Sequence, residues 1–359
     1  MVPGKQKRRI GIKIGSNVLT DSQGFLDKQR IGDLARQIAR LKEQGIEVIL
    51  ISSGAVAAGR SVYKPKSRTD AVGLRQMWSS LGQVQLIQAY SELFTRHNLI
   101  CSQVLVTRED FRSREHFKNM KNCFLVLLSN NIIPIVNEND VVSVTELMFT
   151  DNDELAGLVA GMLNVDLLII LTSVDGIMEK TGQGTLQLIG EIHHGDREFE
   201  KHIRSEKAAF GKGGMLTKAH LAAKVAAHGI EVVIANGLKP GILTKIVQGT
   251  APGTRFVPSA GKSSIKKWLA HAKGFEKGAV IINDGALQAL RSERANSLLP
   301  VGVSAVEGQF KKGDIIMIYD EYRNQAGLGI ARYNDEKARS IIGQKNEKPI
   351  IHYDYLFLF

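Results

Sequence analysis

The chain has 359 residues, 43% of them hydrophobic and 23% charged, a profile that excludes a disordered protein and allows two domains with buried cores. Its apolar runs are too short to span a bilayer as helices, and no signal-peptide h-region follows the basic start, so we expect a cytoplasmic protein without a membrane segment. The net charge of +11 suits an anionic partner, either a phosphorylated small molecule or nucleic acid.

Short β-branched runs alternate with longer amphipathic segments from residue 8 to about residue 250. This alternation predicts an α/β fold, and strands that are apolar on both faces indicate a mostly parallel sheet sandwiched by helices. We predict strands at RIGIKIG (9–15), EVILIS (47–52), CSQVLVT (101–107), IIPIVNE (132–138), DLLIILT (166–172) and GIEVVIA (229–235), and helices near 28–44 and 73–97.

The amino-acid composition changes between about residues 249 and 278, where Gly, Pro, Ser and Lys become frequent. Short alternating runs such as GAVIIND and GDIIMIYD follow, separated by glycine and polar turns, which indicates a small β-rich domain. The resulting division is a first domain over 1–255, a linker over 256–275 and a second domain over 276–359.

Polar residues follow the first two predicted strands, and ligands of an open parallel sheet collect beyond the carboxyl ends of its strands. The first strand carries Lys13 and leads into Gly-Ser-Asn; a strand lysine usually extends to solvent, so Lys13 alone has a structural as well as a functional interpretation. The second leads into SSGAVAAG (52–59), where backbone amides near Ser53 and Gly54 could hold an anionic group. The small residues there are equally compatible with close helix packing.

Two stretches rich in carboxylates and amides come next. NENDVV (137–142), which includes Asp140, follows a buried strand and holds more polar residues than a turn requires. FTDNDELAG (149–157) places Asn152 and Asp153 at the start of a predicted helix, where a single such residue would suffice as a cap. The surplus of polar groups favours a binding site over simple turns and caps.

GKGGMLTKAHLAAK (211–224) places glycines ahead of a predicted helix that carries Lys218. It lacks the G-x-x-x-x-G-K-[ST] spacing of the P-loop, yet a glycine loop that leads into a helix N-terminus still offers free N–H groups and partial positive charge to a phosphate. An ordinary tight turn before a surface helix is the alternative. The turn LTSVDGI (171–177) adds Thr172 and Ser173 after another buried strand.

Two lysines, backbone amides and a group of carboxylates and amides at one sheet edge favour phosphoryl transfer, in which catalysis is mainly positioning and charge neutralisation. The missing general base fits a carboxylate acceptor, because a carboxylic acid with a pKa of about 4.3 is already ionised at neutral pH. No histidine pair or cysteine cluster suggests a protein metal site, and Cys101 and Cys123 are interpreted as reduced thiols.

Six motifs, in their order along nearly the whole chain, resemble the glutamate 5-kinase branch of the amino-acid kinase family: KIGSNVL, SSGAVAAGR, LGQVQLIQAY, NENDVV, TDNDELA and GKGGMLTKAHLAAK. The resemblance implies transfer of the ATP γ-phosphoryl group to the γ-carboxylate of L-glutamate, which gives L-glutamyl 5-phosphate, the first step of proline biosynthesis. The stretch from about residue 276, which includes GLGIARYN, resembles a PUA domain.

The resemblance also implies roles for individual residues. Lys13 and Lys218 would contact the ATP phosphates and the transferring phosphoryl group, and Asp153 would orient both lysines. The glutamate-binding positions would be Ser53, Gly54, Asp140 and Asn152. The nucleotide positions would be Lys13, Thr172, Ser173, Lys212, Gly213, Gly214, Met215, Leu216, Thr217 and Lys218, with Mg²⁺ bridging the phosphates. Ser173 stands where several family members have aspartate, which leaves the role of its side chain open.

The partners that the resemblance implies are L-glutamate, proline as a feedback inhibitor, further copies of the chain in a dimer or tetramer, and a glutamyl 5-phosphate reductase that receives the product. Two alternatives remain. One is a related kinase that acts on another carboxylate or on carbamate. The other is an RNA-binding or RNA-modification accessory protein, which is less favoured because the C-terminal lysines are spread out and no aromatic RNP-type run accompanies them.

Overall fold

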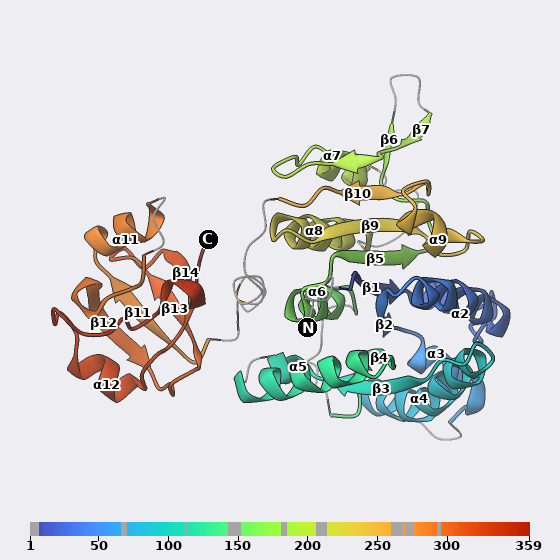
Figure 1. The fold of residues 1–359 in the computed structure, drawn as a ribbon, viewed down its shortest axis with the longest axis horizontal. Coiled ribbons are helices and arrows are strands. Elements are labelled where there is room, and N and C mark those ends of the chain that lie inside the picture. Colours follow the sequence, from blue (N-terminus) through green and yellow to red (C-terminus); the bar gives the residue numbers. More distant parts are fainter. Residues whose placement is uncertain are drawn as a thin grey trace, which may run out of the picture. The chain divides into compact units, whose positions relative to one another are not determined.

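The computed structural model describes residues 7–65, 70–111, 114–142, 152–180, 185–205, 214–259, 269, 274, 276–292 and 296–359. The chain divides into two compact units, Met1–Arg108 with Asn122–Gly261 and Glu109–Lys121 with Lys262–Phe359. Each unit has a sheet and a hydrophobic core of its own (Figure 1).

An eight-stranded sheet forms the first unit, in the order β3-β4-β2-β1-β5-β9-β10-β8. The six strands from β3 to β9 in this order pair in parallel, whereas β10 runs antiparallel to β9 and β8 runs parallel to β10. The predicted mostly parallel α/β sheet is confirmed. Its strands are β1 (Arg9–Ile14), β2 (Glu47–Ser52), β3 (Cys101–Val106), β4 (Ile133–Glu138), β5 (Leu167–Thr172), β8 (Glu191–Ile192), β9 (Glu231–Asn236) and β10 (Thr254–Phe256), and a separate hairpin pairs β6 (Met178–Lys180) with β7 (Leu186–Leu188).

Helices connect these strands. The helix predicted near 28–44 is α2, which begins behind Asp27, where Oδ1 accepts a hydrogen bond from the Arg30 backbone N–H at 2.8 Å. It ends ahead of Gly45, whose φ of 77° is the left-handed conformation typical of a residue that follows a helix. The helices and the 3₁₀ turn of this part of the chain are α1 (Ser16–Leu19), α2 (Lys28–Glu43), α3 (Ala55–Val62), α4 (Ala71–Thr95), η1 (Arg108–Phe111), α5 (Arg114–Ser129), α6 (Asn152–Leu163), α7 (Phe199–Ser205), α8 (Gly214–Ala227) and α9 (Ile242–Val247).

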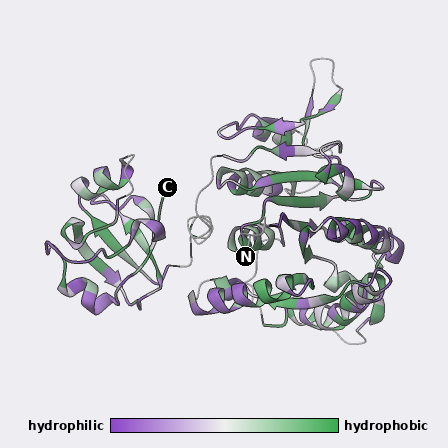
Figure 2. Cartoon of the chain, in the orientation of Figure 1, coloured by the Kyte–Doolittle hydropathy of each residue, from purple (hydrophilic) through white to green (hydrophobic). Residues whose placement is uncertain are grey.

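The two faces of the central strand β1 meet different helices. Ile10, Ile12 and Ile14 belong to the buried cluster that also contains apolar residues of α2, α4 and α9. Because side chains alternate along a strand, Lys13 points to the other face, where α6 and α8 contact each other. Figure 2 shows the central strands mostly in the green of apolar residues, and these buried strands form the base for the polar residues at their ends.

The second unit contains a five-stranded sheet in the order β12-β11-β13-β14-β15, with β11 and β13 parallel and the other pairs antiparallel. Its core includes Val280, Ile316 and Ile318, and the predicted β-rich C-terminal domain is confirmed. The elements are β11 (Gly278–Ile282), α11 (Asp284–Arg291), η3 (Pro300–Gly302), β12 (Val303–Gly308), β13 (Ile315–Tyr319), β14 (Gln325–Ile330), α12 (Asp335–Ser340), η4 (Tyr353–Tyr355) and β15 (Leu356–Leu358).

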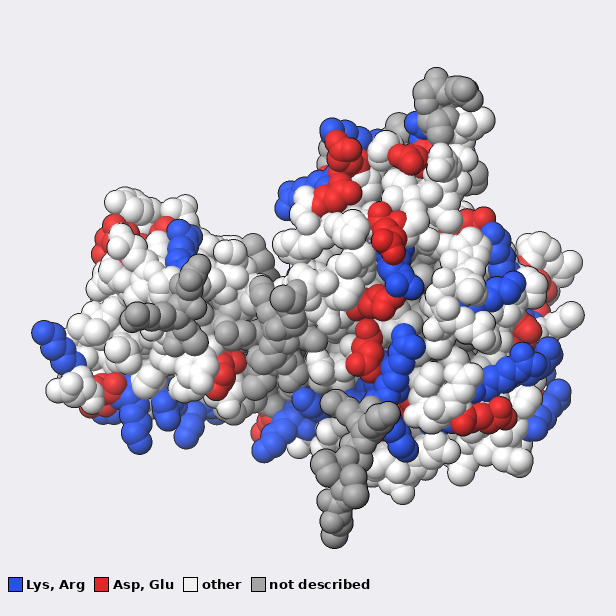
Figure 3. All heavy atoms as spheres, turned by 45° about the horizontal axis from the view of Figure 1, so that its top comes forward, with Lys and Arg blue, Asp and Glu red and all other residues white. Residues whose placement is uncertain are grey.

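Charge is mixed over the visible face of the first unit. Figure 3 shows acidic side chains next to lysines and arginines there, so the net charge of +11 does not form one continuous basic surface on this face. Within the described ranges, no helix combines the length and the apolar character that crossing a membrane requires.

Candidate active site

Two lysines meet one carboxylate at the start of α6. Nζ of Lys13, from β1, lies 2.6 Å from Oδ1 of Asp153, and Nζ of Lys218, from α8, lies 2.8 Å from Oδ2 of the same residue. Lys13 is 2% exposed and Asp153 is 1% exposed. The structure therefore brings together the three residues for which the sequence predicted catalytic roles, and Lys13 does not extend to solvent.

Two cationic side chains of this cluster face the same carboxylate. Two ammonium groups share a single carboxylate in a buried place, where charge is costly unless it is paired. Lys218 retains some exposure through which a ligand can reach it. This arrangement suits an anion that arrives from solvent at the carboxyl ends of β1 and β5.

A cavity of about 260 Å³ lies beside α6. Its walls come from the ends of β2 and β4, the start of α3, the first turns of α4 and the start of α6. The lining residues are Ser16, Ser53, Gly54, Ala55, Val56, Ala57, Arg75, Asn137, Glu138, Asp140 and Asn152. All four residues that the sequence predicted for substrate binding are among them, and they come from three separate parts of the chain.

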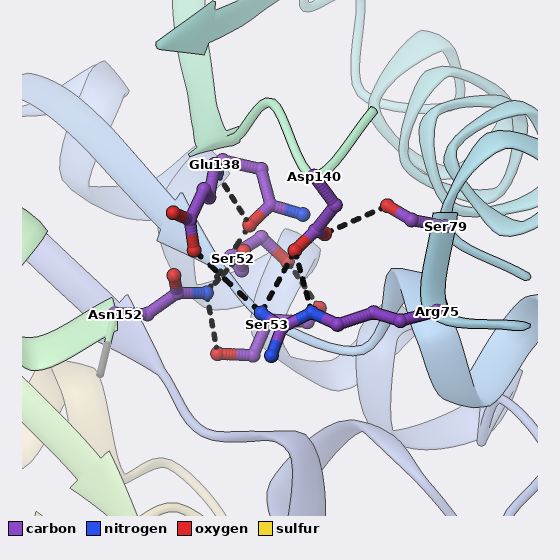
Figure 4. Close-up of polar contacts among 8 residues, drawn as sticks. Ser52, Ser53, Arg75, Ser79, Glu138, Asp140 and Asn152 are labelled. Atoms are coloured by element: carbon purple, nitrogen blue, oxygen red, sulfur yellow. Dashed lines mark hydrogen bonds and ion pairs between the residues drawn. The ribbon is translucent and has the colours of Figure 1, made fainter. Parts of the chain in front are cut away.

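Asn152 connects the walls of the cavity through hydrogen bonds. Its Nδ2 donates to Oγ of Ser53 at 2.9 Å, to Oδ1 of Asn137 at 3.1 Å and to the carbonyl oxygen of Ser52 at 3.3 Å (Figure 4). Because Asn152 directly precedes Asp153 at the start of α6, this network also fixes the position of the lysine-bound carboxylate relative to the cavity.

Asp140 is held by two residues that the sequence analysis did not identify. Its Oδ1 accepts hydrogen bonds from Nη2 and Nε of Arg75 at 2.8 and 3.0 Å, and its Oδ2 accepts one from Oγ of Ser79 at 2.7 Å (Figure 4). Arg75 and Ser79 lie one turn apart on α4, ahead of the LGQVQLIQAY motif of the same helix. The spacing of an arginine and a serine at i and i+4 was the only available signal, and it is common on solvated helices.

Tyr90 contacts the end of β2 from inside the core. Its hydroxyl lies 3.0 Å from Oγ of Ser52 inside the core, and burial raises the pKa of this phenol above its ordinary value. Tyr90 therefore stays neutral and anchors the end of β2 from which Ser53 and Gly54 follow.

Close packing explains the small residues of α3. A Cβ atom added to Gly59 would lie 1.8 Å from the carbonyl oxygen of Trp78, and one added to Gly82 would lie 1.7 Å from that of Ala55. Both glycines thus allow α3 and α4 to touch backbone to backbone. Gly54 has a φ of 98° ahead of α3 and lines the cavity, so the stretch serves helix packing as well as the site.

The remaining predicted nucleotide positions that the structure describes lie at the end of β5 and at the start of α8. Thr172 ends β5, its carbonyl oxygen accepts a hydrogen bond from the backbone N–H of Gly237 at 2.8 Å, and Ser173 is exposed in the turn that follows. Gly214, Met215, Leu216 and Thr217 form the first turn of α8, ahead of Lys218. Lys212 and Gly213 lie outside the described residues, as does Asp151.

An ion pair joins the turns that follow β5 and β9. Asp175 accepts hydrogen bonds from Nζ of Lys239 at 2.6 Å and from Nδ2 of Asn236 at 2.9 Å. These bonds, led by that of Lys239, hold the pKa of Asp175 below its ordinary value. The pair connects two turns at the same sheet edge as the lysine cluster.

The site therefore has two parts: a buried cationic cluster and an adjoining polar cavity that carries two carboxylates, Glu138 and Asp140. In the part of the chain that the structure describes, no three His, Cys, Asp or Glu side chains gather in a way that could hold a metal ion. The cationic cluster suits a polyphosphate, and the cavity suits a small ligand with a cationic group.

Comparisons with known proteins agree with this division. The model of the amino acid kinase family matches residues 8–236, and that of the PUA domain matches residues 278–353. The chain is 50% identical over 352 residues to a glutamate 5-kinase of Chlorobaculum tepidum, with 98% of this chain and 97% of that protein covered. It is 49% identical over 354 residues to a glutamate 5-kinase of Bacteroides thetaiotaomicron, with 98% of each covered.

A solved structure shares the fold of the first unit. Carbamate kinase from Giardia lamblia, bound to AMP-PNP, superposes with a TM-score of 0.50 over 70% of this chain and 99% of that one, at 21% sequence identity. This likeness concerns the fold alone.

Proposed function

The chain belongs to the amino acid kinase family, among its glutamate 5-kinases, and from this premise we propose how the site transfers the ATP γ-phosphoryl group to the γ-carboxylate of L-glutamate. The observation that carries the proposal is the convergence of Lys13 and Lys218 on Asp153 beside a cavity with carboxylates for an ammonium group. The products are ADP and L-glutamyl 5-phosphate.

The reaction is an in-line displacement. An oxygen of the glutamate γ-carboxylate attacks the γ-phosphorus of ATP, the bond to the oxygen that bridges the β- and γ-phosphates breaks, and ADP leaves. The attacking carboxylate is already ionised at neutral pH, so no side chain has to remove a proton. The task left to the protein is to align the two reactants and to neutralise charge.

Lys13 and Lys218 perform the second part of that task. Charge moves from the γ-phosphoryl group to the leaving phosphate oxygen as the bond breaks, and two fixed ammonium groups stabilise it without reorganising. Asp153 holds both lysines in place before ATP arrives. The first turn of α8, which begins at Gly214, offers backbone N–H groups for a phosphate, and Thr172 and Ser173 lie where a nucleotide can pass over the ends of the strands.

The cavity holds glutamate. The carboxylate of Asp140 accepts hydrogen bonds from the α-ammonium group, and Asn152 and Ser53 supply further polar contacts. Gly54 allows the substrate to approach the backbone closely. Mg²⁺ bound to the ATP phosphates would neutralise part of their charge. Both oxygens of Asp153 face lysines, so this carboxylate would not bind the ion directly. We assign this chemistry to a domain over 1–255, joined by a linker over 256–275 to the PUA domain over 276–359.

Three further expectations come with the family. We propose that proline inhibits the enzyme by occupying the glutamate cavity, because it carries the same ammonium and carboxylate pair. We also propose a dimer or tetramer, and delivery of the reactive acyl phosphate to a glutamyl 5-phosphate reductase. We keep the cytoplasm as the expected location, because the reaction consumes ATP.

The reaction can be tested by trapping its product. Incubation with ATP, Mg²⁺ and hydroxylamine should give glutamyl hydroxamate when L-glutamate is present, and no comparable product with aspartate, N-acetylglutamate or carbamate. A preference for one of the other acceptors would favour a different kinase of the same family. Absence of any glutamate-dependent product overturns the proposal.

A further inference from the structure

Arg75 reaches from α4 into the cavity. Its side chain is 45% exposed, and its guanidinium lies against Asp140, with Nη2 at 3.7 Å from Oε2 of Glu138 (Figure 4). Arg75 thus faces the two buried carboxylates of the cavity at once, while part of it stays open to solvent and to a ligand.

Only part of the guanidinium is occupied. Nε and Nη2 both donate to Asp140, whereas Nη1 has no hydrogen-bond partner within the described residues. Ser79 holds the second oxygen of Asp140, so the carboxylate cannot rotate without losing a bond. Arg75 is therefore fixed along one edge, with an N–H group left over in a residue that lines the cavity.

Charge decides what that N–H group can bind. Among the described residues that line the cavity, Arg75 is the one cation, and Glu138 and Asp140 are the anions. Glutamate brings one ammonium group and two carboxylates. The ammonium group matches Asp140, and one carboxylate has to reach the phosphoryl group near Lys13 and Lys218. Arg75 is then the cationic side chain that the other carboxylate can meet in the cavity.

We propose that Arg75 binds the α-carboxylate of glutamate and so determines that the γ-carboxylate is the one phosphorylated. This inference rests on the proposed function and names a substrate contact within it. Arg75 and Asp140 together then recognise both charged groups at the α-carbon, and the hydrogen bonds between them keep the two groups at a fixed spacing. A guanidinium suits this task because its planar donors match a carboxylate and always carry charge.

The test compares two substrates and two variants. L-Isoglutamine keeps the ammonium group and the γ-carboxylate of glutamate but has a neutral amide in place of the α-carboxylate. Arg75→Met removes the hydrogen bonds to Asp140 for both substrates but the α-carboxylate contact for glutamate alone, so kcat/KM should fall by a factor roughly 10- to 100-fold greater for glutamate than for isoglutamine, mainly through KM. Arg75→Lys, which keeps the charge, should recover part of the loss with glutamate.

A role through Asp140 alone gives a different pattern. If Arg75 only positioned Asp140, its loss would weaken the contact between Asp140 and the ammonium group of both substrates. The value of kcat/KM would then fall by the same factor for glutamate and isoglutamine. That result overturns the inference, as would unchanged kinetics with glutamate. If isoglutamine is not turned over by the wild type, its inhibition constant against glutamate replaces kcat/KM, and the same two patterns apply.

Arg96→Met is the matched control. Arg96 is exposed at the other end of α4 and lies outside the cavity, so its loss should leave both substrates unaffected. Failure of the wild type to make any glutamyl hydroxamate would refute the proposed function and this inference with it. An active wild type with equal losses on both substrates would refute the role of Arg75 alone.

Discussion

Lys218 is a charged residue of the site that a ligand can reach, since it pairs with Asp153 and stays partly exposed. Replacement by methionine keeps the apolar stem of the side chain and removes its charge. We expect kcat to fall by roughly 100-fold or more, because a fixed donor to the transferring group is lost. The KM for glutamate should change by less than about threefold, because Lys218 does not line the cavity.

Initial rates of hydroxamate formation measure both quantities. Lys224→Met, an exposed lysine on the same helix, serves as the control and should leave kcat unchanged. Equal losses in the two variants would mean that α8 is damaged in general and that Lys218 has no special role.

The Asp175–Lys239 pair predicts a dependence of stability on pH. The pKa of Asp175 is lowered in the folded state, so its contribution is present above the ordinary pKa of about 3.9 and is lost as the pH falls through the lowered value. Asp175→Asn should therefore reduce the free energy of unfolding at pH 7, by less than about 1 kcal/mol because the pair is partly exposed.

Urea unfolding of the two proteins at several pH values measures this difference. It should be constant from pH 7 to pH 5 and should shrink below the ordinary pKa of aspartate. A difference that grows at low pH would show that the ion pair does not stabilise the fold.

At the scale of elements, the contact between α3 and α4 positions one wall of the cavity. Gly82→Ala would force a Cβ atom against the Ala55 carbonyl, so the helices must separate. We expect a loss of roughly 1–3 kcal/mol in the free energy of unfolding and a higher KM for glutamate, because Ser53 and Gly54 precede α3.

Gly32→Ala is the control for this change. It also adds a methyl group inside a helix, but the nearest atom, Cδ2 of Leu93, lies at 3.4 Å, an ordinary contact. That variant should be as stable as the wild type or slightly more stable. If Gly82→Ala is equally harmless, the close approach of α3 and α4 is not what forms the wall.

The elements themselves were largely predictable from the sequence. Apolar runs with turn residues at their ends located the strands of the parallel sheet, and α2 was evident from its apolar spacing and from Gly45. The short strands β8 and β10 were not predicted, since two or three residues give no periodicity. Their antiparallel orientation relative to β9 depends on long-range pairing.

The site was predictable only in part. The sequence singled out Lys13 inside an apolar strand, Asp140 after a buried strand, and Asn152 and Asp153 at the start of an apolar helix, because polar residues are unexpected in that number at those places. Arg75 and Ser79 were not found, because an arginine and a serine on a long helix look like a solvated face. Their role depends on where α4 places them relative to the end of β4, which is a property of the tertiary fold.

At the scale of the whole molecule, the chain carries two hydrophobic cores in two compact units. We expect calorimetry to resolve two unfolding transitions, since each unit buries its own apolar residues. Glutamate or an ATP analogue should shift only the transition of the first unit, and each ligand alone should add roughly 2.7 kcal/mol to its free energy of unfolding at a hundredfold excess over the dissociation constant. A single transition, or an equal shift of both, would show that the units do not unfold independently.

The central claim is that Lys13 and Lys218 receive the triphosphate of ATP beside a glutamate cavity. A crystal structure with glutamate and a non-hydrolysable ATP analogue tests it most directly. We predict the γ-phosphate in contact with both lysines, the glutamate γ-carboxylate next to it and the α-ammonium group on Asp140. Nucleotide bound instead in the separate cavity of about 340 Å³ between α7 and α8, or glutamate bound away from Asp140, would contradict the account.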